Sequence, residues 1–151
     1  WSAYRPETDG VLVAYTSIYG HTADAAEQLA EELRAKGQQV IVMDLARCDM
    51  AEAVAQAFRF SKLVLATPTY NGDVFPFTKT FIEHLTERNY QNRTVALMEN
   101  GSWAPTAARV MRKMFETSKN LTLLDEIVTI KGSLDAASIA QLHALADALS
   151  K

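Results

Sequence analysis

The chain has 151 residues, of which 48% are hydrophobic and 22% are charged, a composition typical of one soluble globular domain. Its 15 Lys and Arg residues and 18 Asp and Glu residues give a formal net charge of −3. That balance excludes a strongly basic, polyanion-binding protein, so we expect no nucleic acid partner. The apolar content also excludes a disordered chain.

The longest apolar runs, such as Val11–Ala14, are far shorter than the roughly 20 residues that cross a bilayer, so we expect no membrane partner. The chain begins at Trp1, and residues 1–10 are mostly polar or turn-forming, which predicts a linker remnant ahead of a domain over residues 11–151. The single cysteine, Cys48, can form no internal disulfide and is interpreted as a small packing residue. A lone thiol favours a reducing compartment, and we expect the cytoplasm.

Apolar runs typical of buried strands alternate with stretches of helical periodicity along the chain. The expected strands are Val11–Tyr15, Val40–Leu45, Leu63–Ala66, Val95–Met98 and Leu123–Ile130. The expected helices are about His21–Lys36, Met50–Phe58, Phe77–Leu85, a helix with Pro105 in its first turn, and Ile139–Leu149. Because parallel strands need crossover connections, these five units predict a doubly wound α/β fold, a parallel sheet with helices on both faces.

In such sheets ligands bind beyond the carboxyl ends of the strands, so the loops that follow them are the places to seek chemistry. The first loop carries three aliphatic hydroxyls and no lysine or arginine, and consists of Thr16, Ser17, Ile18, Tyr19, Gly20, His21 and Thr22. It lacks the nucleotide-binding glycine patterns, and it suits a terminal phosphate at a helix N-terminus. The alternative is an ordinary capped turn whose hydroxyls satisfy only their own helix.

The loops after the third and fourth expected strands each carry an aromatic residue beside a glycine. The second loop consists of Thr67, Pro68, Thr69, Tyr70, Asn71, Gly72 and Asp73, and the third of Glu99, Asn100, Gly101, Ser102, Trp103 and Ala104. Two aromatics beside a phosphate loop suggest a flat aromatic ligand with a phosphate tail. Ordinary packing of Tyr70 and Trp103 is the alternative.

Other chemistry finds no support along the chain. His21, His84 and His143 lie far apart and one cysteine builds no thiolate site, so we expect no metal centre. A Gly-x-Ser-x-Gly elbow is absent, so Ser102 is not expected to be a nucleophile. We therefore expect no catalytic side chain.

Together, the three loops resemble the FMN-contacting loops of flavodoxins, over about residues 11 to 150. The resemblance implies a flavodoxin-like fold with strand order 2-1-3-4-5, the FMN phosphate at residues 16–22 and the isoalloxazine ring between Tyr70 and Trp103. The cofactor-binding residues that it implies are Thr16, Ser17, Ile18, Tyr19, Gly20, His21, Thr22, Pro68, Thr69, Tyr70, Asn71, Gly72, Asp73, Asn100, Gly101, Ser102 and Trp103.

Two segments, Thr67–Asp73 with Pro76, and Glu99–Pro105, are more narrowly similar to the C-terminal flavodoxin domain of flavodiiron proteins, also called A-type flavoproteins. That resemblance implies a diiron, metallo-β-lactamase-like domain in the same polypeptide or in a dimer mate, which reduces O₂ or NO. It also implies rubredoxin or an NAD(P)H-linked reductase as electron donor and a head-to-tail dimer. The expected function is therefore electron relay by bound FMN.

Three alternatives stay open. The chain could be a free-standing NAD(P)H-dependent FMN or quinone reductase, or an apo interaction module that kept the fold. A receiver-type signalling domain is disfavoured, because Tyr15-Thr16 stands where an acidic cluster would be expected.

A carboxylate beside a flavin would disfavour the reduced anion, and Asp73 and Glu99 are the candidates for that role.

Overall fold

The computed structural model describes residues 8–16, 21–70, 73–74, 76–88, 90–100, 107–116, 118, 120–124, 126–130 and 135–150. The strands are β1 (Thr8–Tyr15), β2 (Val40–Asp44), β3 (Phe60–Tyr70), β4 (Asp73–Val74), β5 (Arg93–Asn100), β6 (Leu121–Leu123) and β7 (Val128–Ile130). The helices are α1 (His21–Ala35), α2 (Met50–Arg59), α3 (Pro76–Glu87), α4 (Ala107–Met114) and α5 (Ala136–Leu149). A helix is present at each of the five places where the sequence predicts one, and the predicted position of Pro105 in the first turn of the fourth helix lies outside the described residues. None of the described helices is long and apolar enough to span a bilayer.

The sheet has the order β2-β1-β3-β5-β6, with parallel pairing between all of these neighbours. Strand β7 also pairs with β5 in parallel, so β6 and β7 together occupy the position of a fifth strand. The short strand β4 pairs antiparallel with the end of β3. The predicted doubly wound sheet with order 2-1-3-4-5 is therefore confirmed.

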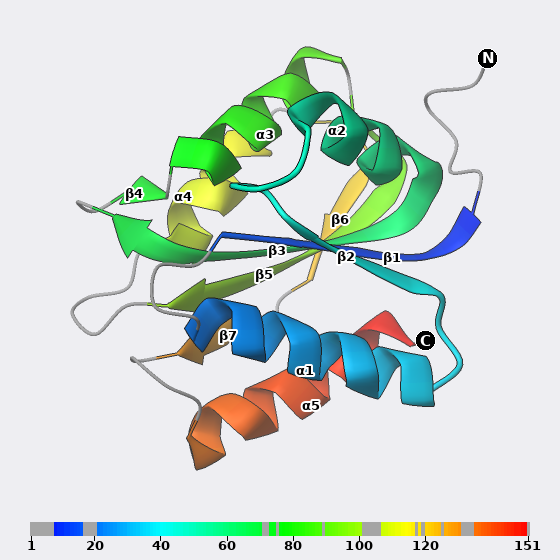
Figure 1. The fold of residues 1–151 in the computed structure, drawn as a ribbon, viewed down its shortest axis with the longest axis vertical. Coiled ribbons are helices and arrows are strands. Elements are labelled where there is room, and N and C mark those ends of the chain that lie inside the picture. Colours follow the sequence, from blue (N-terminus) through cyan, green and yellow to red (C-terminus); the bar gives the residue numbers. More distant parts are fainter. Residues whose placement is uncertain are drawn as a thin grey trace.

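Helices cover both faces of the sheet, with α2, α3 and α4 on one face and α1 and α5 on the other (Figure 1). Strand β1 shows how the sequence builds two cores, because its side chains point alternately to the two faces. Leu12 packs in the cluster under α2, α3 and α4, whereas Val11 and Val13 pack in the cluster under α1 and α5. A strand that is buried on both faces explains the continuous apolar run at this position.

The structure corrects three boundaries at the carboxyl end of the sheet. Strand β3 continues through Thr67–Tyr70, which the sequence predicts as loop, because Thr67 and Pro68 stay paired with β5 and the next two residues pair with β4. Glu99 and Asn100 likewise belong to β5 and not to the loop after it. The single strand predicted over Leu123–Ile130 is two strands, because pairing with β5 stops after Leu123 and resumes at Val128.

At its amino end, β1 begins earlier than the sequence predicts. Thr8, Asp9 and Gly10 are strand residues, so they belong to the sheet and not to the linker remnant predicted over residues 1–10. Gly10 is held by close packing, since a Cβ there would lie 2.7 Å from the Gln39 carbonyl oxygen and 3.0 Å from the Phe60 ring. The folded domain therefore starts no later than Thr8.

Candidate functional site at the carboxyl edge of the sheet

Three buried threonine hydroxyls meet where β1 and β3 end. The Thr16 Oγ1 atom lies 2.9 Å from Thr67 Oγ1 and 3.1 Å from Thr78 Oγ1, and all three side chains are fully buried. Thr16 follows β1, Thr67 lies near the end of β3, and Thr78 lies in the first turn of α3. The contacts therefore join the first predicted ligand loop to the second and to the helix that follows it.

The direction of the hydrogen bonds in this cluster follows from the acceptor of the Thr67 hydroxyl. The Thr67 hydroxyl donates to the Pro68 carbonyl oxygen at 3.2 Å. Since a hydroxyl has one hydrogen to donate, the Thr16 hydroxyl donates to Thr67, and the Thr78 hydroxyl donates to Thr16. The cluster is thus a directed chain of hydrogen bonds that holds two loop bases in fixed relation.

A second contact joins the first and third predicted loops. The Asn100 side-chain amide donates to Thr22 Oγ1 at 3.3 Å, although 78 positions separate the two residues. Thr22 is 2% exposed and lies one residue after the start of α1, and Asn100 is the last residue of β5. Because Thr22 accepts this hydrogen bond, its own hydroxyl hydrogen remains available to a ligand.

The start of α1 provides a second set of donors at the same edge. The first four N–H groups of a helix have no intrahelical acceptor, and the helix dipole favours an anion there. His21 is the first residue of α1, so these N–H groups lie at the Thr22 and Asn100 contact. Hydroxyl and N–H donors fit a phosphate, as the sequence predicts for this loop.

The end of β3 forms a hairpin at this edge with β4. Thr69 pairs with Val74 and Tyr70 pairs with Asp73. Earlier in the same predicted loop, Thr67 and Pro68 pair with the last two residues of β5. The side chains of His21, Thr69, Tyr70 and Asp73 lie outside the description. The remaining predicted site residues also lie outside the described residues, and they are Ser17, Ile18, Tyr19, Gly20, Asn71, Gly72, Gly101, Ser102 and Trp103.

Two residues at this edge have roles that the sequence reasoning missed. Thr78 lies three, four and seven positions before Phe81, Ile82 and Leu85 on the buried face of α3, a spacing that could have identified it. Glu99 uses both carboxylate oxygens within the protein, accepting from the Ala108 N–H at 3.0 Å and from the Thr129 hydroxyl at 2.8 Å. Nothing in the sequence indicates these partners of Glu99.

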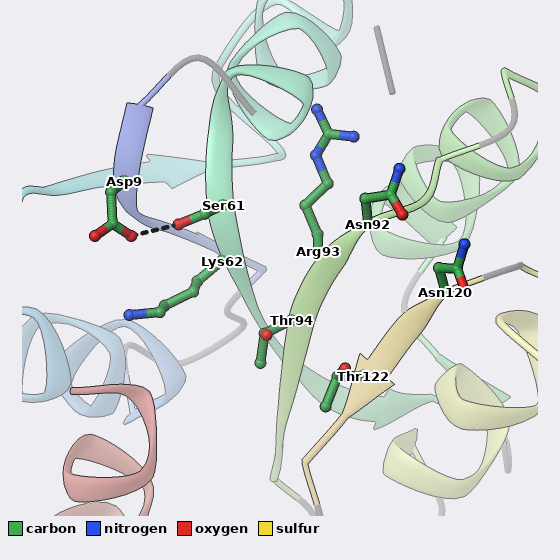
Figure 2. Close-up of a pocket in the computed structure, with 8 residues that line it drawn as sticks. All are labelled: Asp9, Ser61, Lys62, Asn92, Arg93, Thr94, Asn120 and Thr122. Atoms are coloured by element: carbon green, nitrogen blue, oxygen red, sulfur yellow. Dashed lines mark hydrogen bonds between the residues drawn. The ribbon is translucent and has the colours of Figure 1, made fainter. Parts of the chain in front are cut away.

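A cavity of about 300 Å³ lies at the opposite, amino edge of the sheet (Figure 2). The residues that line it are Asp9, Ser61, Lys62, Asn92, Arg93, Thr94, Asn120 and Thr122. Its charged groups have partners within the protein, since Asp9 accepts from Ser61 at 2.9 Å and Lys62 donates to Gln38 at 3.4 Å. The Arg93 guanidinium contacts the rings of Phe58 and Tyr90. This cavity contains none of the residues predicted to bind a ligand.

The described residues around Thr22 provide neutral hydrogen-bond donors. In the described parts of the first loop and the first turn of α1, no lysine or arginine occurs. Across the residues that the structure describes, no three His, Cys, Asp or Glu side chains gather as a metal site would require. The hydroxyl and backbone N–H groups at this edge can therefore serve as donors to an anion.

A parallel sheet of this order with helices on both faces defines the flavodoxin-like class of α/β proteins, in which ligands bind at the carboxyl edge where these threonine hydroxyls lie. The family model described as "Flavodoxin domain" matches residues 12–145. The chain belongs to this family.

The relatives of the chain include proteins much longer than it and proteins of about its own length. The rubredoxin-oxygen oxidoreductase of Megalodesulfovibrio gigas is 20% identical over 149 residues, which cover 99% of this chain and 37% of the relative. A solved structure of a rubredoxin oxygen:oxidoreductase from Desulfovibrio gigas has a TM-score of 0.89 and 19% identity, and the match covers 96% of this chain and 36% of that one. The flavodiiron protein of Giardia intestinalis has a TM-score of 0.85 and 16% identity, and the match covers 95% of this chain and 36% of that one. A flavodoxin from Streptococcus pneumoniae has a TM-score of 0.78 and 21% identity, and the match covers 93% of this chain and 97% of that one. The chain thus spans about a third of the length of the curated relative that it matches.

Proposed function

We propose that this chain is an FMN-binding electron-transfer domain that relays electrons to a diiron centre carried by another domain. The observation that supports the proposal most directly is the convergence of the three predicted ligand segments on one edge. Thr16 contacts Thr67 across 51 positions, and Asn100 contacts Thr22 across 78. Residues so far apart in sequence share this edge only because the fold places them there.

The described residues fit the phosphate end of FMN. The Thr22 hydroxyl and the N–H groups at the start of α1 would hold the phosphate, and Asn100 would fix the Thr22 side chain through its hydrogen bond. Thr16, Thr67 and Thr78 would keep the first two loops in register. The residues proposed as ring contacts are Pro68, Thr69, Tyr70, Asn71, Gly72, Asp73, Gly101, Ser102 and Trp103. Those proposed beside the phosphate are Ser17, Ile18, Tyr19, Gly20 and His21. When bound, FMN supplies one- and two-electron transfer.

The proposal also names an electron acceptor and an electron donor. The relatives from Megalodesulfovibrio gigas and Giardia intestinalis are named as a rubredoxin-oxygen oxidoreductase and a flavodiiron protein, and each is almost three times as long as the matched region. On this basis we propose a diiron, metallo-β-lactamase-like domain as acceptor, and rubredoxin or an NAD(P)H-linked reductase as donor. We further propose that the FMN domain predicted over residues 11–151 also includes Thr8–Gly10 of β1, and that it works in the cytoplasm.

The test is a flavin-binding measurement on the purified chain. FMN is added to the flavin-free protein, and binding is followed by flavin fluorescence and by the visible absorption spectrum, with riboflavin as the ligand that lacks the phosphate. The proposal expects tighter binding of FMN than of riboflavin, and negligible NAD(P)H oxidation by the domain alone. Steady NAD(P)H oxidation would favour the free-standing reductase, and a protein that binds neither flavin would favour the interaction module.

A further inference from the structure

Glu99 is a nearly buried carboxylate at the end of β5, 9% exposed, and it joins three elements of the carboxyl edge. One oxygen, Oε1, accepts from the backbone N–H of Ala108 in α4 at 3.0 Å. The other, Oε2, accepts from the Thr129 hydroxyl of β7 at 2.8 Å. Burial of a carboxylate is costly unless such hydrogen bonds replace its hydration, so this arrangement needs a physical reason.

The contact with α4 has electrostatic support. Ala108 is the second residue of α4, so its N–H is one of the donors at the helix start that lack an intrahelical acceptor. A carboxylate at this end of a helix also interacts favourably with the helix dipole. Glu99 therefore ties the end of β5 directly to the start of α4.

The contact with Thr129 extends the connection to α5. The Thr129 N–H donates to the side-chain oxygen of Gln141 at 2.8 Å. Gln141 belongs to α5, which covers the face of the sheet opposite to α4 (Figure 1). Glu99 is thus anchored, through Thr129, to a helix on the opposite face of the sheet from α4.

We infer that Glu99 is a positioning residue for the flavin-ring part of the site, an inference that rests on the proposed function. Its link to Ala108 joins the points between which Asn100, Gly101, Ser102 and Trp103 lie in sequence, namely the end of β5 and the start of α4. Its link to Thr129 anchors the Glu99 side chain itself. Glu99 acts on the flavin through this segment, because its two hydrogen bonds fix its side chain between α4 and β7 at the base of the segment. A segment fixed at its base presents its ligand contacts with less loss of conformational entropy on binding.

Four variants test this inference. Glu99→Ala removes both links, Glu99→Gln keeps an acceptor for the Ala108 N–H, and Thr129→Val removes only the hydroxyl link. Glu116→Ala is the matched control, because Glu116 is an exposed glutamate just after α4. For each variant the dissociation constants of FMN and riboflavin are measured, together with the flavin fluorescence per bound flavin at saturation.

The inference expects Glu99→Ala to weaken FMN and riboflavin by the same factor, about tenfold, because both ligands carry the ring. Glu99→Gln and Thr129→Val should weaken the binding of both flavins by a smaller factor. The fluorescence per bound flavin should likewise change most in Glu99→Ala and less in the other two variants. Glu116→Ala should leave all three quantities unchanged. A purely structural role would lower the amount of folded protein while leaving the emission per bound flavin as in the unmodified chain.

The outcomes separate the two proposals. If the unmodified chain binds FMN and the Glu99 variants match Glu116→Ala, the inference alone is overturned. If the unmodified chain binds no flavin, the proposed function is overturned and the inference with it. Should Glu99→Ala fail to fold, Glu99→Gln and Thr129→Val decide the question, because each preserves one of the two links.

Discussion

Asn100 donates a hydrogen bond of 3.3 Å to Thr22, and this contact brings the end of β5 to the start of α1. The Thr22 side chain is thereby oriented with its hydroxyl hydrogen free for an acceptor beyond the helix start. Within the proposed function that acceptor is the phosphate of FMN. The contact therefore connects the part of the site that would bind the phosphate to the part that would bind the ring.

Substitution of Thr22 by valine should weaken FMN far more than riboflavin. A hydrogen bond to a charged group contributes about 1.5–3 kcal/mol, so we expect the FMN dissociation constant to rise by roughly ten- to a hundredfold. The riboflavin dissociation constant should stay within about twofold. Thr22→Ser, which keeps the hydroxyl, should retain most of the FMN affinity, and Thr80→Val on the exposed side of α3 is the control. Equal losses for both flavins would show that Thr22 does not face a phosphate.

The directed chain of threonine hydroxyls predicts an order of stabilities. Thr67→Val removes the acceptor of the Thr16 hydroxyl and the side-chain donor to the Pro68 carbonyl oxygen, so it should lower the free energy of unfolding by about 1–3 kcal/mol. Thr78→Val removes only the first donor of the chain, so it should cost less. Urea unfolding of the two variants measures the difference. A larger cost for Thr78→Val would contradict the donor order.

The close approach at Gly10 tests whether the start of β1 belongs to the folded domain. A Cβ at position 10 would lie 2.7 Å from a backbone oxygen of Gln39, so the strand or its neighbour must shift. We expect Gly10→Ala to destabilise the domain by about 1–3 kcal/mol in urea unfolding. The control is Gln39→Ala, because Gln39 is exposed and its contact with Gly10 uses the backbone. An unchanged stability of Gly10→Ala would mean that Thr8–Gly10 is dispensable.

Much of the fold could be predicted from the sequence, because its strands are buried on both faces and its helices carry apolar stripes. The boundaries that failed depend on pairing between distant residues. Thr67–Tyr70 contains a proline and turn-forming neighbours, yet β5 and β4 keep it in a strand. The break between β6 and β7 has a similar origin, since strand pairing with β5 ends at Leu123 and resumes at Val128.

The candidate site was predictable to a smaller extent. Loop positions and residue types indicated the carboxyl edge and the threonines at 16, 22 and 67. The third hydroxyl of the cluster, Thr78, belongs to a helix, and its polar role depends on a contact with Thr16 across 62 positions. The sequence suggested Glu99 as a charge beside the flavin, but it did not indicate the hydrogen bonds that Glu99 accepts from α4 and β7. Such partners follow from the fold and not from local pattern.

Cys48 provides a test of local burial that depends on pH. The thiol is half-buried against the core under α2, and this burial raises its pKa, with the carboxylates of Asp44, Asp49 and Glu52 acting in the same direction. Since only the thiolate is alkylated, the native chain should react with iodoacetamide more slowly than the chain in urea at the same pH. The midpoint of the rate against pH should also lie higher in the native chain, a shift that reduced access alone would not produce.

The same shift has a consequence for stability. A thiol whose pKa is raised by folding contributes stability that is fully present below its unfolded pKa and is lost as the pH rises through its folded pKa. The free energy of unfolding should therefore fall in this alkaline range, and Cys48→Ala should remove that part of the fall. Urea unfolding of both chains across the range provides the measurement. Identical pH dependences for the two chains, or equal alkylation midpoints in native and unfolded protein, would show that Cys48 is solvated like a free thiol.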